Sequence, residues 1–93
     1  MPIRSFKCDD TRLLFDGELV RRFVNIEAVA MRKPAMLNRA ARLDDLRVPP
    51  GNRLEALRGD RAGQHSVRVN DQFRVCFRRT PAGPADVEIV DYH

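Results

Sequence analysis

The stretch that decides the fold is Pro49–Phe77, PPGNRLEALRGDRAGQHSVRVNDQFRVCF. Its second half holds two runs in which apolar and polar residues alternate, 65–69 and 73–77, with Asn70-Asp71 between them. Successive side chains of a strand point to opposite faces of a sheet, and Asn and Asp favour tight turns. The stretch therefore predicts a β-hairpin that packs on one side only.

The two faces of the second run differ in chemistry. Its apolar side chains fall on one face and its guanidinium groups fall on the other. The apolar set is Phe73, Val75 and Phe77, and the opposite set is Arg74, Cys76 and Arg78. A polar function of this sheet is therefore expected on the face that carries the arginines.

The residues before the hairpin lead into it through a turn, a strand and a loop. Pro49–Asn52 is a turn signal because proline fixes φ and glycine admits positive φ. Residues 53–58 resemble a short strand with Leu54 and Leu57 as its apolar members, and residues 59–63 form a polar loop. We expect this strand to join the sheet of the hairpin.

Two helices are expected upstream. Asp9-Asp10 is suited to cap a first helix, which Gly17 ends. Asn25 is suited to cap a longer helix, whose apolar residues recur at three- and four-residue spacing. Pro34 interrupts that pattern because it lacks the backbone N–H and clashes with the preceding turn. It predicts a kink or two abutting helices.

The remaining segments complete a mainly antiparallel sheet. Residues 2–7 are expected to form a short first strand, 43–47 a loop or helical turn, and 80–84 a turn rich in proline and glycine. The chain closes on the β-rich run 86–93. The order β-α-α-β-β-β-β defines an α+β domain with two helices on one face of the sheet.

Composition predicts one small domain, residues 1–93, in the cytoplasm. With 43% apolar residues the chain can form one core. It has no apolar run of about 18 residues that would span a membrane and no secretory signal at its start. Two cysteines and two histidines match no metal spacing, so we expect neither a zinc site nor a disulfide framework, and no cofactor.

Arginine dominates the positive charge. Lys+Arg number 17 against 13 Asp+Glu, a formal net charge of +4, and fifteen of the 17 cations are arginine. The planar guanidinium binds phosphate through two parallel hydrogen bonds and stacks on bases. This balance suits an RNA or DNA partner, although genomic base composition explains it equally well.

Several groups on the arginine-bearing face and at the chain end are suited to cleaving RNA without a metal. A base takes the proton of the ribose 2′-hydroxyl, an acid protonates the leaving 5′-oxygen, and guanidinium groups stabilise the phosphorane. The candidates are Arg53, Glu55, Arg58, Arg61, Arg74, Arg78, Asp91, Tyr92 and His93. Structural interpretations compete with this one: solvated loop charges for Arg58 and Arg61, and coverage of the open sheet face for Arg74. Glu55 suits a salt bridge equally well, and Tyr92 suits closure of the sheet edge.

At these residues the sequence resembles the HigB branch of the RelE-type toxins. The resemblance is carried by Leu54–Gly63, Ser66–Phe77 and Val87–His93, and it extends over essentially the whole chain. It implies the toxin of a type II toxin–antitoxin pair. Such a toxin enters the ribosomal A site and cleaves the translated mRNA there, which inhibits translation and arrests growth.

By position, the resemblance assigns roles in transition-state stabilisation, proton transfer and RNA binding. The catalytic set is Arg58, Arg74, Asp91, Tyr92 and His93, and the RNA-binding set is Arg53, Arg61, Arg68 and Arg78. Glu55 stands where some relatives have histidine, and a carboxylate can act as a base but also repels phosphate. The general base is therefore open between Glu55, Asp91 and His93.

The resemblance also implies partners. These are a HigA-like helix-turn-helix antitoxin, the ribosome and mRNA, with a heterotetramer in the antitoxin complex, a monomer when free, and no membrane contact. Two other interpretations of the fold compete with the ribonuclease. One is a non-catalytic RNA- or DNA-binding regulator, and the other is a protein-interaction module whose sheet face receives a partner segment.

Overall fold

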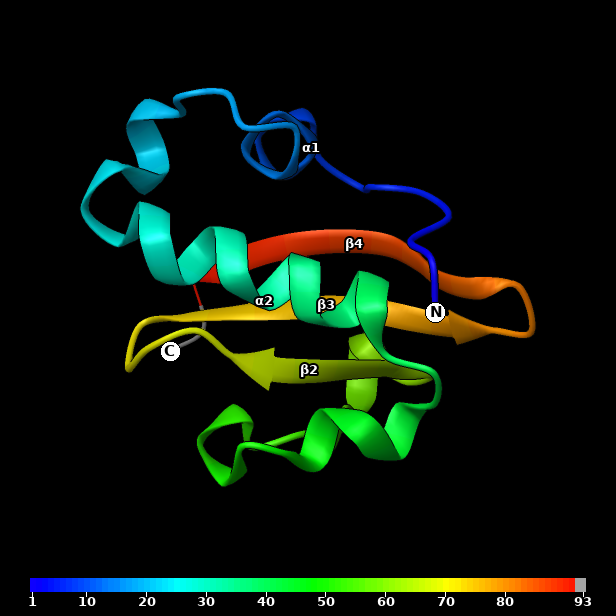
Figure 1. Ribbon diagram of the computed structural model, residues 1–93. Coiled ribbons are helices and arrows are strands. Elements are labelled where there is room, and N and C mark those ends of the chain that lie inside the picture. The colour runs from blue at the N-terminus through cyan, green and yellow to red at the C-terminus, as the bar shows by residue number, and fades with distance from the viewer. Residues whose placement is uncertain (92–93) are drawn as a thin grey trace.

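Two α-helices pack against a four-stranded antiparallel sheet, with α2 across one face and α1 above β4 (Figure 1). The computed structural model describes residues 1–91. Its elements, with η for 3₁₀ helices, are α1 (Asp9–Phe15), η1 (Arg21–Ile26), α2 (Glu27–Arg39), η2 (Leu43–Arg47), η3 (Pro50–Asn52), β1 (Glu55–Ala56), η4 (Gly59–Arg61), β2 (Gln64–Arg68), β3 (Phe73–Thr80) and β4 (Gly83–Asp91). The strand order β1-β2-β3-β4 confirms the expected α+β fold. Within residues 1–91, no helix is long and apolar enough to cross a bilayer.

A core of fully buried apolar side chains holds α2 on the sheet. Leu37 of α2 and Val75 and Phe77 of β3 are all 0% exposed. Phe23 of η1 meets Phe73 edge to face, with ring centroids 6.2 Å apart. Each large apolar side chain buried in this way contributes about 1.5–3 kcal/mol to folding. The apolar face predicted for β3 is therefore the face that α2 covers.

The hairpin predicted from Asn70-Asp71 is present. β2 and β3 pair antiparallel, and β3 continues three residues beyond the predicted run, to Thr80. Oδ1 of Asn70 accepts hydrogen bonds of 2.8 Å from the backbone N–H groups of Gln72 and Phe73. This local capture of backbone donors is why Asn suits the turn. The turn expected at 80–84 is also present, between β3 and β4.

The N-terminal segment runs parallel to β4, but it is not a regular strand. Phe6 and Val87 form a single β-bridge. Backbone hydrogen bonds on either side join Arg4 N–H to Pro84 C=O at 2.7 Å and Lys7 N–H to Val87 C=O at 3.0 Å. The strand expected over 2–7 is thus reduced to a bridge, because the chain turns away to start α1.

Side chains of the helical layer cap the next part of the β4 edge. The N–H of Ile89 donates to Oγ1 of Thr11 at 3.0 Å, and its C=O accepts from Nη2 of Arg22 at 3.2 Å. Thr11 is fully buried, and its hydroxyl lies 3.0 Å from Sγ of Cys8. An unpaired strand edge is a template for pairing with other chains. Here that edge is occupied by the protein's own groups.

Both helices begin differently from the prediction. Sγ of Cys8 accepts the N–H of Thr11 at 3.4 Å, so Cys8 is the N-cap of α1 and Asp9-Asp10 lie in its first turn. Carboxylates there still favour the helix because its N-terminus carries partial positive charge. Asn25 lies inside η1 and caps nothing, since α2 begins at Glu27 directly after that 3₁₀ helix.

Pro34 does not divide α2, which is one continuous helix from Glu27 to Arg39. The prediction of two abutting helices is therefore wrong. Ala30 and Leu37, one turn on either side of Pro34, are 0% exposed. Burial of this apolar face outweighs the missing hydrogen bond, a loss of about 3 kcal/mol in a helix interior.

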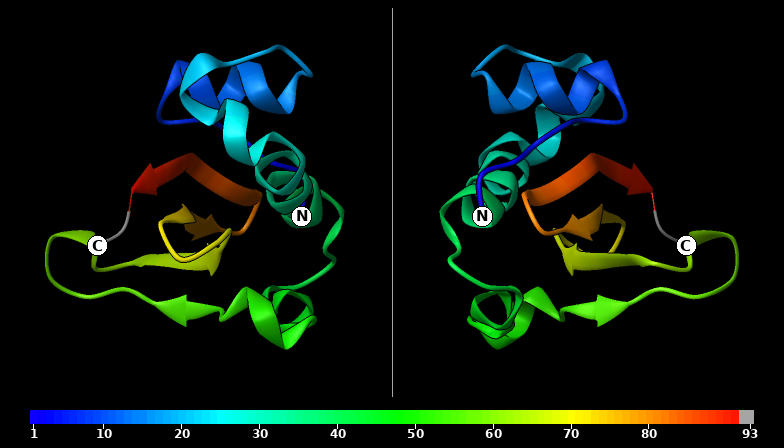
Figure 2. Two further views of the ribbon diagram at one scale, coloured as in Figure 1. Left: turned by 90° about the vertical axis from the view of Figure 1, so that its left-hand side faces the viewer. Right: turned by 90° about the vertical axis from the view of Figure 1, so that its right-hand side faces the viewer.

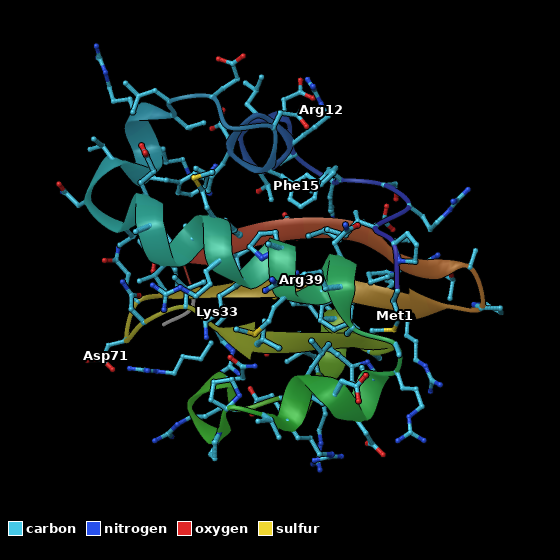
Figure 3. The ribbon with its side chains drawn as sticks, viewed as in Figure 1. Met1, Arg12, Phe15, Lys33, Arg39 and Asp71 are labelled. Atoms are coloured by element: carbon cyan, nitrogen blue, oxygen red, sulfur yellow. The ribbon has the colours of Figure 1, made fainter. Side chains whose placement is uncertain are left out.

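A buried lysine holds the segment that leads to β1. Lys33 of α2 is 8% exposed, and its Nζ donates to Oδ1 of Asn52 at 2.6 Å (Figure 3 shows Lys33 on α2). Nδ2 of Asn52 in turn donates to the C=O of Leu46 at 3.1 Å. Burial, together with the charges of Arg32 and Arg68, lowers the pKa of Lys33. These contacts tie η2 and η3 to α2.

β1 is shorter than the strand expected over 53–58. Its two residues pair with Ser66 and His65 of β2. The chain enters β1 from Arg53, whose φ of +46° is left-handed, and leaves it towards η4. The turns on both sides limit the ladder to these two residues.

Candidate functional site

The face of the sheet opposite α2 is covered by charged side chains. Figure 2 shows α2 and the loop that contains η4 on opposite sides of the sheet. Cys76 points to the η4 side, yet it is 0% exposed. Burial raises the pKa of its thiol, and the charges that act on it belong to Arg61, Glu88, Arg74 and Glu55. Ion-paired side chains therefore cover this face in place of a second layer of helices. The layer that they form contains Arg61, Glu88, Arg74 and Glu55.

Arg74 is fixed by contacts to three different segments. Its Nε donates to Oγ of Ser66 at 2.8 Å, and its Nη2 donates to the C=O of Arg53 at 2.7 Å. Its Nη1 lies 3.5 Å from Oε1 of Glu55. Only 13% of the Arg74 side chain is exposed, against 50% of Glu55. Arg74 is thus part of the layer, whereas Glu55 presents its carboxylate to solvent.

Arg61 closes the neighbouring part of the same layer. Its Nη1 donates to Oε1 of Glu88 at 3.0 Å and to Oε1 of Gln64 at 3.1 Å. The side chain of Glu88 is 14% exposed. Hydrogen bonds between ionised groups are about twice as strong as neutral ones. Arg61, expected to bind RNA, therefore already has a carboxylate partner.

Arg58 is the exposed cation of this region. It lies between β1 and η4, and its guanidinium makes no hydrogen bond or ion pair with any of residues 1–91. Arg58 lines a shallow hollow together with Glu55, Ala56 and Leu57. An anion entering this hollow would meet a guanidinium that has no partner among residues 1–91, and Glu55 lines the same hollow.

The other arginines predicted to bind RNA are spread across the sheet. Arg53 is exposed at the entry to β1. Arg68 pairs with Asp71, which Figure 3 shows at the turn between β2 and β3. Arg78 pairs with Asp86 at 3.1 Å near the other end of the sheet. Of these three, Arg53 lies nearest to the hollow along the chain.

Asp91, the last residue described, is exposed at the end of β4. In the register of β3 with β4 it is opposite Phe73, and cross-strand partners share a face. Its Oδ2 accepts a hydrogen bond of 3.0 Å from Nε2 of Gln72. The cross-strand partner of Arg74 is Val90. Arg74 and Asp91 therefore belong to opposite faces.

A bulge sets this arrangement. Thr80 is opposite Gly83, but Cys76 is opposite Glu88, so the register shifts by one residue between them. The shift occurs near Asp86, whose φ of +53° is left-handed. A one-residue shift exchanges the two faces of a strand. It brings the apolar residues of β4 into the core and carries Asp91 to the same side.

Two of the candidate groups at the chain end, Tyr92 and His93, lie outside the described residues. Within residues 1–91, the structure brings Glu55 and Arg58 to one hollow and sets Arg74 against Glu55. It places Asp91 on the other face. The same part of the chain contains no group of three His, Cys, Asp or Glu side chains placed to hold a metal ion.

Sequence reasoning overlooked three polar residues of this layer: Ser66, Gln64 and Glu88. Ser66 is 0% exposed and contacts Arg74, whereas Gln64 and Glu88 accept from Arg61. One signal was available for Ser66 and Gln64. Both fall at the polar positions of the β2 alternation, on the face shared with Arg74 and Cys76.

The chain belongs to a known class of proteins, the RelE-like toxins. A model of the family described as the RelE-like toxin of the type II toxin-antitoxin system HigB matches residues 4–93. The chain is a member of this HigB family, which confirms the resemblance noted in its sequence.

Individual relatives match over part of their length. Toxin HigB-1 of Vibrio cholerae serotype O1 is 46% identical over 54 residues, 58% of this chain and 57% of that protein. An uncharacterised protein of Haemophilus influenzae is 37% identical over 54 residues, 58% of this chain and 54% of that protein. The chain thus spans somewhat more than half the length of these relatives. The YoeB/ParE toxin from Agrobacterium tumefaciens superposes with a TM-score of 0.48 at 21% identity, covering 100% of this chain and 99% of that chain.

Proposed function

We propose that this protein is the toxin of a type II toxin–antitoxin pair and a ribosome-dependent endoribonuclease that cleaves translated mRNA in the A site. The observation that carries the proposal is the hollow that Arg58, an exposed cation, and Glu55 both line. Cleavage of mRNA in the cytoplasm would stop translation and arrest growth.

In the proposed reaction the ribose 2′-hydroxyl loses its proton to a base, and the 2′-oxygen forms a bond to phosphorus. The bond to the 5′-oxygen breaks, and that oxygen takes a proton from an acid. The products are a 2′,3′-cyclic phosphate and a free 5′-hydroxyl. Arg58 stabilises the negative charge that develops on the phosphorane. No step of this mechanism needs a metal.

Among the three candidate bases, Glu55 is favoured by its position. It lines the hollow with Arg58, whereas Asp91 belongs to the opposite face of the sheet. Tyr92 and His93 are proposed to supply the proton for the leaving oxygen, as the family resemblance implies. Message binding is assigned to Arg53, Arg61, Arg68 and Arg78.

The ribosome is proposed to supply orientation that the protein lacks. The hollow is shallow, with four residues at its lining. Fixing two reactants in a productive geometry can account for about 7–11 kcal/mol of a reaction barrier. We therefore expect free RNA to be cut weakly or not at all. Rapid cutting of free RNA by the purified protein would contradict this part of the proposal.

The deciding experiment is primer extension on a message translated in vitro, with Arg58→Ala compared against Arg39→Ala. Arg39 is exposed on α2, so both variants lose one exposed positive charge (Figure 3 labels Arg39). Arg58→Ala is expected to lower cleavage roughly 100- to 1,000-fold, the cost of one transition-state donor. Arg39→Ala is expected to change it less than about 3-fold.

Two further results separate the possible outcomes. A 2′-deoxy nucleotide at the scissile position should abolish cleavage, because the nucleophile is then missing. A non-catalytic binder would give a different result. Arg58→Ala and Arg39→Ala would then lower the affinity for RNA equally, and each would reduce the salt dependence of that affinity by about one phosphate contact.

The partner proposed for this toxin is a HigA-like helix-turn-helix antitoxin. We expect a heterotetramer of the two proteins and a monomer for the toxin alone. Light scattering of the co-expressed pair and of the separated toxin measures both masses. A stable toxin dimer without antitoxin would contradict the expected monomer.

A further inference from the structure

We propose that Ser66 is a positioning residue of the cleavage site: its buried hydroxyl fixes Arg74, and Arg74 in turn fixes the carboxylate of Glu55. This inference rests on the proposed function, because it assigns Glu55 as the base. It gives Arg74 a role in orienting Glu55 from within the layer. Ser66 touches neither message nor ribosome in this assignment.

The first step is the position of Ser66 on β2, between Glu55 of β1 and Cys76 of β3. Ser66 lies directly opposite Glu55 of β1 on one side and opposite Cys76 of β3 on the other. Arg74 lies two residues from Cys76 on β3, so its side chain must pass over Ser66 to reach Glu55. Diagonal neighbours at this spacing are about 7–8 Å apart, within reach of a long side chain.

The second step is the fit of the guanidinium. Its Nε–H is directed to Oγ of Ser66 at 2.8 Å, and its Nη2 to the C=O of Arg53 at 2.7 Å. Because the guanidinium is planar and rigid, two such bonds on different nitrogens fix its plane. The remaining terminal nitrogen, Nη1, then faces Oε1 of Glu55. Two of the contacts that orient Arg74 thus come from β2 and from the left-handed turn at Arg53.

The third step is the side chain that this position requires. Ser66 is 0% exposed beneath an arginine that is itself only 13% exposed. A larger side chain would block the passage of Arg74, and alanine would remove the hydroxyl oxygen that accepts the Nε–H of this nearly buried cation. The loss of a hydrogen bond to a charged group is costly. Serine satisfies both conditions, small volume and an accepting oxygen.

The test compares Ser66→Ala with Ser5→Ala in the full chain. The hydroxyl of Ser5 also accepts a hydrogen bond, from Asp86 N–H at 2.8 Å, but it lies on the N-terminal segment beside β4. Solvent exchange of the Arg74 Nε–H, followed by NMR, should quicken roughly 10- to 100-fold in Ser66→Ala, the worth of one hydrogen bond to a charged group. It should be unchanged in Ser5→Ala.

Cleavage is measured in parallel as a single-turnover rate on ribosomes that carry a message. Ser66→Ala should lower this rate about 10-fold or more, with ribosome affinity within about 2-fold, because orientation and not binding is lost. Arg74→Lys removes the Nε–H. In that background Ser66→Ala should therefore have no further effect, whereas independent roles would multiply.

The outcomes distinguish this inference from the function on which it rests. Faster Nε–H exchange with an unchanged cleavage rate, or additive losses in the double variant, would overturn the positioning role and leave the nuclease intact. A wild-type protein that cuts no message, with Arg74 still protected, would overturn the proposed function and the catalytic purpose of Ser66 together. Thermal unfolding of both serine variants identifies a rate loss that comes from misfolding.

Discussion

The two faces of β3 show two ways of excluding water from one sheet. Phe77 and Val75 are buried by α2, through contact between apolar side chains. Cys76, between them in sequence, is buried to the same 0% exposure on the face where the Arg61–Glu88 pair lies. The first face depends on apolar volume, and the second depends on paired charge.

This difference between the two faces shows which arginines still have positive charge to offer a phosphate. Most arginines of the charged face already hold a carboxylate: Arg61 with Glu88, Arg68 with Asp71, Arg74 with Glu55 and Arg78 with Asp86. Their charge is largely used in holding the layer together. A count of arginines therefore overstates the positive charge that is available to an incoming phosphate, and the exposed Arg58 makes up more of that available charge than a count suggests.

The largest effect is expected on the apolar face. Phe77→Ala removes a fully buried ring under α2, and such truncations cost about 3–5 kcal/mol of the free energy of unfolding. Urea unfolding followed by circular dichroism measures the loss. A cost below about 1 kcal/mol would show that α2 is not held by apolar volume, and the contrast between the faces would fail.

The charged face should give a smaller but definite loss. Glu88→Ala removes the carboxylate that accepts a hydrogen bond from Arg61, and a hydrogen bond to a charged group is worth about 1.5–3 kcal/mol. Arg78→Ala is the matched control. Its pair with Asp86 is 56% and 46% exposed, and exposed pairs contribute about 0–1 kcal/mol. Equal losses for the two variants would mean that the Arg61–Glu88 pair is only a surface contact.

The smallest expected effect is a pH dependence that comes from His65. Its ring stacks on Phe77 with centroids 6.1 Å apart, and burial, with the charge of Arg79, lowers its pKa in the fold. The unfolded chain then takes up this proton first. The free energy of unfolding should therefore fall as pH drops below about 6.5, the ordinary histidine value.

His65→Gln should flatten this slope between pH 7.5 and 5.5, because glutamine takes up no proton there. Urea midpoints of the two proteins across that range make the comparison. The same slope in both would assign the pH dependence to other groups.

Local patterns were enough to predict the hairpin and its two unlike faces. The alternation of Phe73 to Phe77 and the turn at Asn70 are properties of neighbouring residues, and both are confirmed. The ion pairs were beyond such reasoning. Arg61 and Glu88 are 27 residues apart and meet only when β4 folds back on β3.

The face of Asp91 shows most clearly what sequence alone could not supply. The alternation gives a strand two faces but does not say which face meets the core when the register shifts. Counting back from the turn at Thr80 and Gly83 without the bulge would place Asp91 on the arginine side. The bulge near Asp86 exchanges the two faces of β4 beyond it. Val87 and Ile89 therefore point into the core, and Asp91 falls on the same face as they do.

The bridge between Phe6 and Val87 has a consequence for how a cell makes this protein. These partners are separated by 81 residues, so the segment that is synthesised earlier waits for the later one before it can pair. Until then Phe6 and Thr11 have no β4 to bind, and contacts between such distant residues form slowly. A nascent chain therefore cannot complete its sheet until synthesis has reached β4.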